Sequence, residues 1–230
     1  MSLDKKILHI IPAAGKATRF GGIPKFLLPL SKDSFLIKHH ASDLRIENTN
    51  IKKVIATSSE NYDTLKRMKL DVDLIQIESQ TMNETVIKVL ESYPDYDDFL
   101  LTMPDTYFSD NQIVNNLFNK YIEKEKTCSL GLFEIKDYQI GKLGQCKLNG
   151  DNVEKVIDKD KNCIFEYAWG LIIWNKKFNK FINPKDPHIG YIINPIIKKK
   201  YNVSYSISNS QYYDCGTFDE YKKLLNDLAK

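Results

Sequence analysis

Short apolar runs alternate with segments of helical periodicity in the first half of the chain. The run from Ile7 to Ile11, broken only by His9 and ending at Pro12, is typical of a strand buried on both faces of a parallel sheet. Further strands are predicted at 54–57, 74–77 and 99–103, and helices at 35–46 and 83–90. Strands separated by helix-length segments predict right-handed crossovers, and therefore an α/β fold with a mostly parallel central sheet flanked by helices.

The pattern changes after about residue 126. Strands divided by turn residues are predicted at 128–135, 144–148, 153–157 and 167–174, followed by helices at 189–200 and 218–228 with a strand at 203–206 between them. This half therefore indicates an additional mixed or antiparallel region. No internal repeat or flexible linker divides the chain, so we expect a single domain over 1–230, with a core at about 7–126 and a second half at about 127–228.

Composition narrows the class of protein. Hydrophobic residues make up 42% of the 230 positions, enough for a sizeable core, and the formal net charge is only +3. This balance argues against nucleic-acid binding and against a polybasic membrane surface. No apolar run approaches the roughly 20 residues of a membrane span, the first residues do not resemble a signal peptide, and the four cysteines form no C-x-x-C pair. We therefore expect a cytoplasmic protein with reduced cysteines.

The loop after the first strand combines small residues with positive charge. Glycine and alanine at 13–15 and 21–22 let backbone N–H groups approach an anion, while Arg19 and Lys25 add two cations. The loop contains neither a Walker A motif nor an intact G-x-G-x-x-G. An isolated glycine-rich stretch is usually a surface loop, but two cations between a buried strand and Pro24 favour a phosphate-bearing ligand.

Two aspartates follow predicted strand ends in distant parts of the sequence. Asp105 comes directly after Pro104 and the strand at 99–103, and Asp214 precedes Cys215-Gly216-Thr217 and the last helix. Either alone is equally well explained as a turn or capping residue. Ligands of α/β sheets bind beyond the carboxyl ends of the strands, so two acids converging on a phosphate loop there indicate a hard cation such as Mg²⁺.

At these positions the sequence resembles the sugar-phosphate nucleotidylyltransferases, also called nucleotide-sugar pyrophosphorylases. Ala13-Ala14-Gly15 with Thr18-Arg19, followed by Pro24-Lys25-Phe26-Leu27-Leu28-Pro29, is similar to their A-A-G-x-G-T-R and P-K-x-L-L-P motifs. Further similarities, in family order, are Pro104-Asp105, Asp158-Lys159 as a variant of an E-K-P step, Ala168-Trp169-Gly170, and Asp214-Cys215-Gly216-Thr217. The resemblance runs from about residue 7 to residue 228.

The resemblance implies a Rossmann-like core of the GT-A type and a reversible, Mg²⁺-dependent reaction in which an NTP and a sugar 1-phosphate give an NDP-sugar and pyrophosphate. It implies that Lys25 holds the α-phosphate, Arg19 the pyrophosphate and Lys159 the sugar phosphate, with Asp105 and Asp214 as metal ligands. The implied nucleotide-binding residues are Ala13, Ala14, Gly15, Lys16, Arg19, Lys25, Glu84 and Pro104, and the implied sugar-phosphate-binding residues are Asp158, Lys159, Trp169 and Gly170. Since both reactants are anions, charge neutralisation and alignment suffice without a protein nucleophile.

Several readings stay open at this point. Lys16-Ala17 stands where the family usually carries x-Gly, and Glu84 either accepts hydrogen bonds from a base or sits in the first turn of a helix. The base and the sugar are therefore not assigned, and the sequence leaves a homo-oligomer open. One alternative is a cytidylyltransferase for phosphocholine or methylerythritol phosphate, although the H-D-A-x-R-P motif of the latter is absent. Another is a non-catalytic nucleotide-sugar sensor, which the presence of all four charged site residues disfavours.

Overall fold

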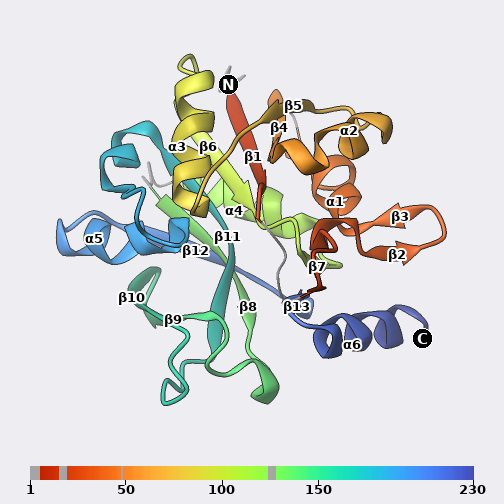
Figure 1. Ribbon diagram of the computed structural model, residues 1–230. Coiled ribbons are helices and arrows are strands. Elements are labelled where there is room, and N and C mark those ends of the chain that lie inside the picture. Colours follow the sequence, from red (N-terminus) through yellow and green to blue (C-terminus); the bar gives the residue numbers. More distant parts are fainter. Residues whose placement is uncertain (1–5, 16–19, 48, 124–127) are drawn as a thin grey trace.

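A nine-stranded sheet runs through the protein, with helices on both faces (Figure 1). The computed structural model describes residues 6–15, 20–47, 49–123 and 128–230. From one edge to the other the strands are β5 (Asp73–Gln76), β4 (Ile51–Thr57), β1 (Ile7–Ala13), β6 (Asp98–Thr102), β11 (Tyr167–Asn175), β8 (Cys128–Glu134), β12 (Val203–Ser208), β10 (Asn152–Asp158) and β9 (Gly144–Asn149).

Strand direction changes along the sheet. β5, β4, β1 and β6 are parallel, as the apolar runs predicted, and β12 is parallel to β8. β11 lies antiparallel between β6 and β8, and β9 and β10 also pair antiparallel. The first four strands are parallel as expected, and the other five form the mixed region expected for the second half, although they belong to the same sheet. This one sheet contains strands from both sides of residue 126, so the division of the domain into two halves stays a prediction.

β1 continues through Pro12 to Ala13, beyond the predicted strand end. It pairs with β6 only as far as Ile10, whereas its pairing with β4 extends to Ala13. Past Ile10 one side of β1 therefore has no neighbouring strand, and the N–H that Pro12 lacks is not needed for the ladder. This open side lies at the carboxyl end of the strand, where the polar loop begins.

Two layers of helices cover the sheet because side chains of each buried strand alternate between its faces. Leu8 and Ile10 belong to a core that includes residues of α3 (Met82–Ser92) and α5 (Ile193–Lys198). On the opposite face, Ile7 and Ile11 belong to cores formed with α1 (Leu36–Lys38), α2 (Ser59–Arg67) and α4 (Gln112–Glu123). Figure 1 shows α3 and α5 on one side of the sheet and α1 and α2 on the other.

The predicted helix at 35–46 is shorter and less regular in the structure. Ser34–Phe35 forms strand β3, which pairs with β2 (Pro29–Ser31), so the helix begins only at Leu36. It continues as a π-helical segment, His39–Asp43, and ends before Leu44. The predicted helix at 189–200 likewise begins as a 3₁₀ turn, Ile189–Ile192, before α5. Neither α2 nor α4 is predicted from the sequence.

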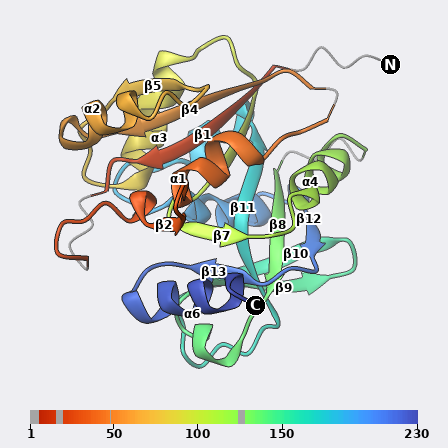
Figure 2. The same ribbon diagram turned by 90° about the vertical axis from the view of Figure 1, so that its right-hand side faces the viewer.

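A small two-stranded ribbon connects distant parts of the chain beside the sheet. β7 (Thr106–Phe108) pairs antiparallel with β13 (Tyr212–Asp214), and α6 (Phe218–Leu228) follows after the cap residue Thr217. Figure 2 shows β13 and α6 below the parallel strands.

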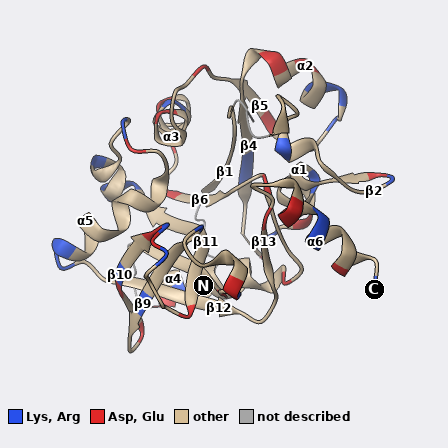
Figure 3. Ribbon diagram, turned by 60° about the horizontal axis from the view of Figure 1, so that its bottom comes forward, with Lys and Arg blue, Asp and Glu red and all other residues tan. Residues whose placement is uncertain are grey.

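Lys, Arg, Asp and Glu are interspersed over the helices and loops in Figure 3, in agreement with the balanced charge. Among the described residues, no helix combines the length and the apolar character that crossing a bilayer requires.

Candidate active site

Two adjoining cavities open at the carboxyl ends of β1 and β6. The first has a volume of about 260 Å³ and is lined by the loop after β1, by the segment from Ser79 to Met82, and by Pro104. The second has a volume of about 280 Å³ and is lined by residues from the second half of the chain, including Asp158, Trp169 and Asp214. Lys25, Met82 and Asp105 line both cavities. The cavities therefore meet along a charged wall.

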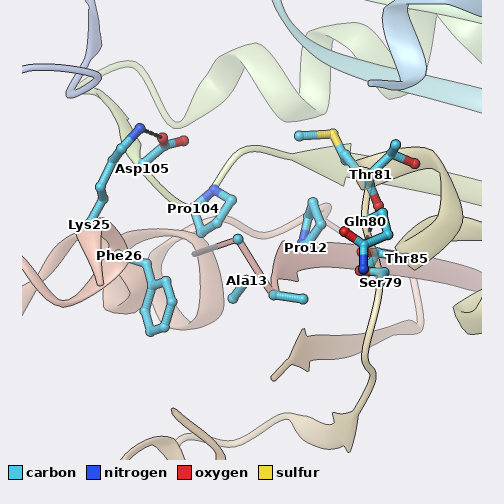
Figure 4. A pocket seen from close by; sticks show the side chains of 13 residues that line it. Pro12, Ala13, Lys25, Phe26, Ser79, Gln80, Thr81, Thr85, Pro104 and Asp105 are labelled. Carbon is cyan, nitrogen blue, oxygen red and sulfur yellow. Dashed lines mark hydrogen bonds and ion pairs between the residues drawn. The ribbon is translucent and has the colours of Figure 1, made fainter. Parts of the chain in front are cut away.

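The shared wall is built on an ion pair. Lys25 begins a short 3₁₀ turn after the polar loop, and its Nζ lies 3.1 Å from Oδ2 of Asp105, which follows β6. Figure 4 shows the pair at one end of the first cavity, with Pro12, Ala13 and Pro104 between it and the polar side chains that begin at Ser79. The side chain of Lys25 is 16% exposed and that of Asp105 29%, so both ends of the pair can reach a ligand.

The ribbon brings Asp214 next to this ion pair. Asp214 pairs in register with Thr106, and the neighbouring Cys215 donates its backbone N–H to the carbonyl oxygen of Asp105 at 3.0 Å. Burial, reinforced by the negative charges of Asp105 and Glu220, raises the pKa of Asp214 to about 7. The site therefore holds more negative charge than Lys25 neutralises, and a cation bound there would relieve the repulsion.

The far side of the second cavity carries a second charged group. Nε2 of His188 lies 3.2 Å from Oδ2 of Asp158, the last residue of β10, and Lys159 follows directly. Burial alone would raise the pKa of Asp158, but the hydrogen bond from His188 and the charge of Lys159 outweigh burial and lower it. Asp158 is therefore held as a carboxylate, which can only accept hydrogen bonds.

Trp169 forms a wall of the second cavity because two glycines leave room for its indole. A Cβ added at Gly144 would overlap the ring nitrogen and lie 2.8 Å from Cδ1 of Trp169, and one at Gly190 would lie 2.9 Å from Cε2. Real Cβ atoms essentially never approach another heavy atom this closely. Both positions thus require a residue without a side chain, and they fix the indole between them.

A match between a known family and the first half of the sequence decides the family of this chain. Residues 9–131, more than half of the chain, match the MobA-like NTP transferase domain. The chain belongs to the MobA-like NTP transferase family. No curated protein matched the sequence.

Solved nucleotidyltransferases have the same overall fold as this MobA-like chain. A Bacillus anthracis protein described as a glucose-1-phosphate thymidylyltransferase is 18% identical, with a TM-score of 0.80 over 96% of this chain and 95% of the other. A UTP-bound UGPase from Acinetobacter baumannii is 16% identical, with a TM-score of 0.74 over 97% and 92%. An inositol-1-phosphate CTP transferase from T. maritima is 17% identical, with a TM-score of 0.72 over 97% and 96%. The expected resemblance to sugar-phosphate nucleotidylyltransferases is confirmed at the level of the fold.

Most of the residues expected from the sequence lie at these two cavities. The residues that line at least one of them are Ala13, Ala14, Gly15, Lys25, Pro104, Asp105, Asp158, Lys159, Trp169 and Asp214. Lys16 and Arg19 lie outside the described residues, so their expected contacts with a nucleotide stay predictions. The fold therefore gathers residues from both halves of the sequence around one cleft.

Glu84 and Gly170 do not line either cavity. Glu84 occupies the first turn of α3, where its carboxylate accepts from the backbone N–H of Gln80 at 2.7 Å and pairs with Lys88 at 2.8 Å. The helix-start reading of Glu84 is thus the one that the geometry favours. Gly170 is a packing position, because a Cβ there would lie 2.7 Å from the ring of Phe133. Its expected contact with a sugar phosphate stays a prediction.

Several lining residues were not identified from the sequence. Ser79 and Gln80 line the first cavity, and Gly144 and His188 line the second. The segment from Ser79 follows the parallel strand β5, so the rule that ligands bind beyond strand ends could have identified it. His188 lies in an irregular loop without periodicity, and no local pattern marks it as a site residue.

Proposed function

We propose that this MobA-like NTP transferase transfers a nucleoside monophosphate from an NTP to a sugar 1-phosphate, giving an NDP-sugar and pyrophosphate. The main support is the wall of Lys25 and Asp105 that the two cavities share. One cavity would receive the nucleotide and the other the acceptor, so that their reacting phosphates meet at this wall. The parallel order β5-β4-β1-β6, with the site at the strand ends, also supports a Rossmann-like core of the GT-A type.

The chemistry needs no covalent enzyme intermediate. A phosphate oxygen of the acceptor attacks the α-phosphorus of the NTP, the bond to the bridging oxygen breaks, and pyrophosphate leaves with that electron pair. Lys25 would stabilise the negative charge that develops at the α-phosphate, and Lys159 would hold the acceptor phosphate. Arg19 is proposed to bind the departing pyrophosphate. The backbone of Ala13 to Gly15 would lie against the nucleotide phosphates.

Asp105 and Asp214 fit a magnesium ion. The described part of the chain contains no group of three or more His, Cys, Asp or Glu side chains that could hold a metal alone. Mg²⁺ is commonly bound by one or two carboxylates and completed by substrate phosphates and water, which matches a pair of acids beside a phosphate site. Such an ion supplies charge neutralisation at the phosphate oxygens. Burial first, and then the negative charges of Asp105 and Glu220, raise the pKa of Asp214, and a bound cation would oppose these effects.

A cyclic polyol phosphate is a second candidate acceptor. One structural neighbour is an inositol-1-phosphate CTP transferase, and inositol presents ring hydroxyl groups much as a hexose does. Phosphocholine instead carries a quaternary ammonium without a hydrogen-bond donor.

We propose a cytoplasmic location, which is supported by four cysteines that are all buried and free of disulfides.

A substrate panel tests the proposal. The protein is mixed with MgCl₂, each of dTTP, UTP, CTP and GTP, and each of several hexose 1-phosphates, inositol 1-phosphate, phosphocholine and methylerythritol phosphate. Pyrophosphate release and the mass of the product are measured together. An NDP-sugar from one combination supports the proposal, turnover only with phosphocholine would replace it with the cytidylyltransferase reading, and nucleotide binding without any turnover would favour a sensor.

Lys25→Ala tests the role of the shared wall. We expect kcat to fall roughly a hundredfold or more, because a preorganised cation at the developing charge is removed. Lys66→Ala is the matched control, since Lys66 is an exposed lysine in the last turn of α2. A Lys25→Ala enzyme that turns over as fast as this control would show that the reacting phosphates lie elsewhere.

A further inference from the structure

His188 makes an oriented contact that the proposed chemistry leaves without a role. Its Nε2 lies 3.2 Å from Asp158 Oδ2, and the two side chains are only 14% and 22% exposed. The other ring nitrogen, Nδ1, is buried and has no hydrogen-bond partner among residues 6–15, 20–47, 49–123 and 128–230. A proton on Nδ1 would find no acceptor, so the proton belongs on Nε2 and the imidazole donates to Asp158.

The loop that carries His188 is fixed to the wall of the nucleotide cavity. The side-chain amide of Asn83, a fully buried residue of α3, donates to the carbonyl oxygen of Asn183 at 3.0 Å. The hydroxyl of Thr81 donates to Pro184 at 2.6 Å, and the backbone N–H of Met82 to Pro187 at 3.3 Å. Three hydrogen bonds from the consecutive residues 81–83 hold the segment 183–187, so the backbone of the loop cannot shift without breaking them.

Rings on both sides restrict the imidazole itself. Its centroid lies 5.8 Å from that of Trp169 and 4.9 Å from that of Tyr191, the latter in an edge-to-face arrangement. The Trp169 indole is in turn confined by the glycines described above. With backbone and ring both restrained, His188 presents its Nε2–H to Asp158 in one direction.

This arrangement leaves the second oxygen of the Asp158 carboxylate available to a ligand. Oδ2 accepts from His188, and within the described ranges Oδ1 takes part in no hydrogen bond or ion pair. Asp158 faces the second cavity beside Lys159. A carboxylate held in this way accepts hydrogen bonds from hydroxyl groups of a ligand whose phosphate lies at the lysine.

Building on the proposed function, we propose that His188 is a positioning residue that holds Asp158 toward the hydroxyl groups of the acceptor, and that this pair selects a hydroxylated ring phosphate. A phosphorylated hexose or inositol offers such donors, whereas phosphocholine offers none. His188 acts through Asp158 and makes no contact of its own with the reacting phosphates.

A double-mutant cycle tests the inference with the acceptor identified by the substrate panel. Asp158→Ala and His188→Ala should each raise the KM for the acceptor roughly tenfold, with less than about a twofold change in the KM for the NTP. In the Asp158→Ala background, His188→Ala should have no further effect, because the group it orients is gone. His188→Gln should restore part of the affinity, since the amide nitrogen of Gln can donate in the place of Nε2.

Two controls separate positioning from structural damage. Tyr191→Phe keeps the ring beside His188 and should leave both KM values unchanged, and thermal unfolding checks that each variant is folded. If His188→Ala does not fold, His188→Gln and its combination with Asp158→Ala complete the cycle. Additive effects of the two substitutions, or equal effects on both substrates, would overturn the inference. A wild-type enzyme without turnover would instead overturn the proposed function.

Discussion

Asp214→Asn removes a negative charge that the fold places beside a second carboxylate. Asparagine has nearly the same shape, so packing at the end of β13 is preserved while the charge is lost. In the wild-type protein, burial and the charge of Asp105 raise the pKa of Asp214 from 3.8 to about 7. We expect the variant to be inactive, if Asp214 holds the metal, and yet to be more stable than the wild type at neutral and alkaline pH.

The size of the effect follows from the shift in pKa. A group whose pKa is raised on folding contributes stability that is fully present below its unfolded pKa and is lost as the pH rises through the folded pKa. Here the window runs from about pH 4 to about pH 7. A shift of about 3 units at about 1.36 kcal/mol each gives an upper bound of about 4 kcal/mol. Because Asp214 is partly exposed, solvent screening reduces the expected loss to about 2 kcal/mol.

Urea unfolding measures this loss directly. Wild type and Asp214→Asn are unfolded at pH 5 and pH 8 in the presence of EDTA, and the free energies of unfolding are compared at each pH. The variant should gain about 1 kcal/mol on the wild type between the two pH values, because at pH 5 part of the loss has already occurred. Asp63→Asn, at an exposed carboxylate of α2, is the matched control and should show no such gain. If the free energies of unfolding of the wild type and of Asp214→Asn change equally between pH 5 and pH 8, the account of the buried charge is refuted.

Three further changes probe other parts of the structure. Gly144→Ala should force the Trp169 indole to move and cost about 1 to 3 kcal/mol of stability, and a melting temperature equal to that of the wild type would contradict the described packing. Burial and the charge of Lys53 lower the pKa of His9 to about 3, so its contribution to stability is present above about pH 6.5 and is lost toward pH 3. His9→Gln should therefore lose less stability on acidification, measured by urea unfolding at pH 4 and 7, and an equal loss would reject this explanation. Tyr121→Phe removes the hydroxyl that donates to buried Asp98 at 2.6 Å and should cost about 1.5 to 3 kcal/mol in the same assay, whereas no cost would mean that this hydrogen bond is not stabilising.

Local pattern predicted the buried strands well. The apolar run that begins at Ile7 predicted β1, and the observed bounds of α6, Phe218–Leu228, agree with the predicted ones. Prediction was weaker where tertiary pairing decides the local structure. Phe35 has the spacing of a helical residue, but its pairing with Pro29 makes it a strand residue. The polar surface of α2 offers only one fully buried residue, Leu65, so its helical periodicity is weak.

The arrangement of the site depends on contacts that no local pattern reveals. β7 and β13 have three residues each and are separated by about a hundred positions in the sequence, yet their pairing places Asp214 beside Asp105. The family motifs predicted that both acids belong to one site, and the ribbon provides the physical reason. His188 was not found from the sequence because its position depends on hydrogen bonds between an irregular loop and the start of α3.

The distribution of charge in the cleft connects stability with binding. Lys25 and Lys159 both lower the pKa of Asp214, but burial and the carboxylates of Asp105 and Glu220 exert the larger effect. The site therefore keeps cations and anions close together without full compensation. Under the proposed function, such a site would gain most from a ligand that carries both signs, because a phosphate chain would compensate the lysines and its bound cation the aspartates. Burial and repulsion lower the stability of the protein at this site, and under the proposed function the same uncompensated charge would favour a nucleotide bound together with a metal over either component alone.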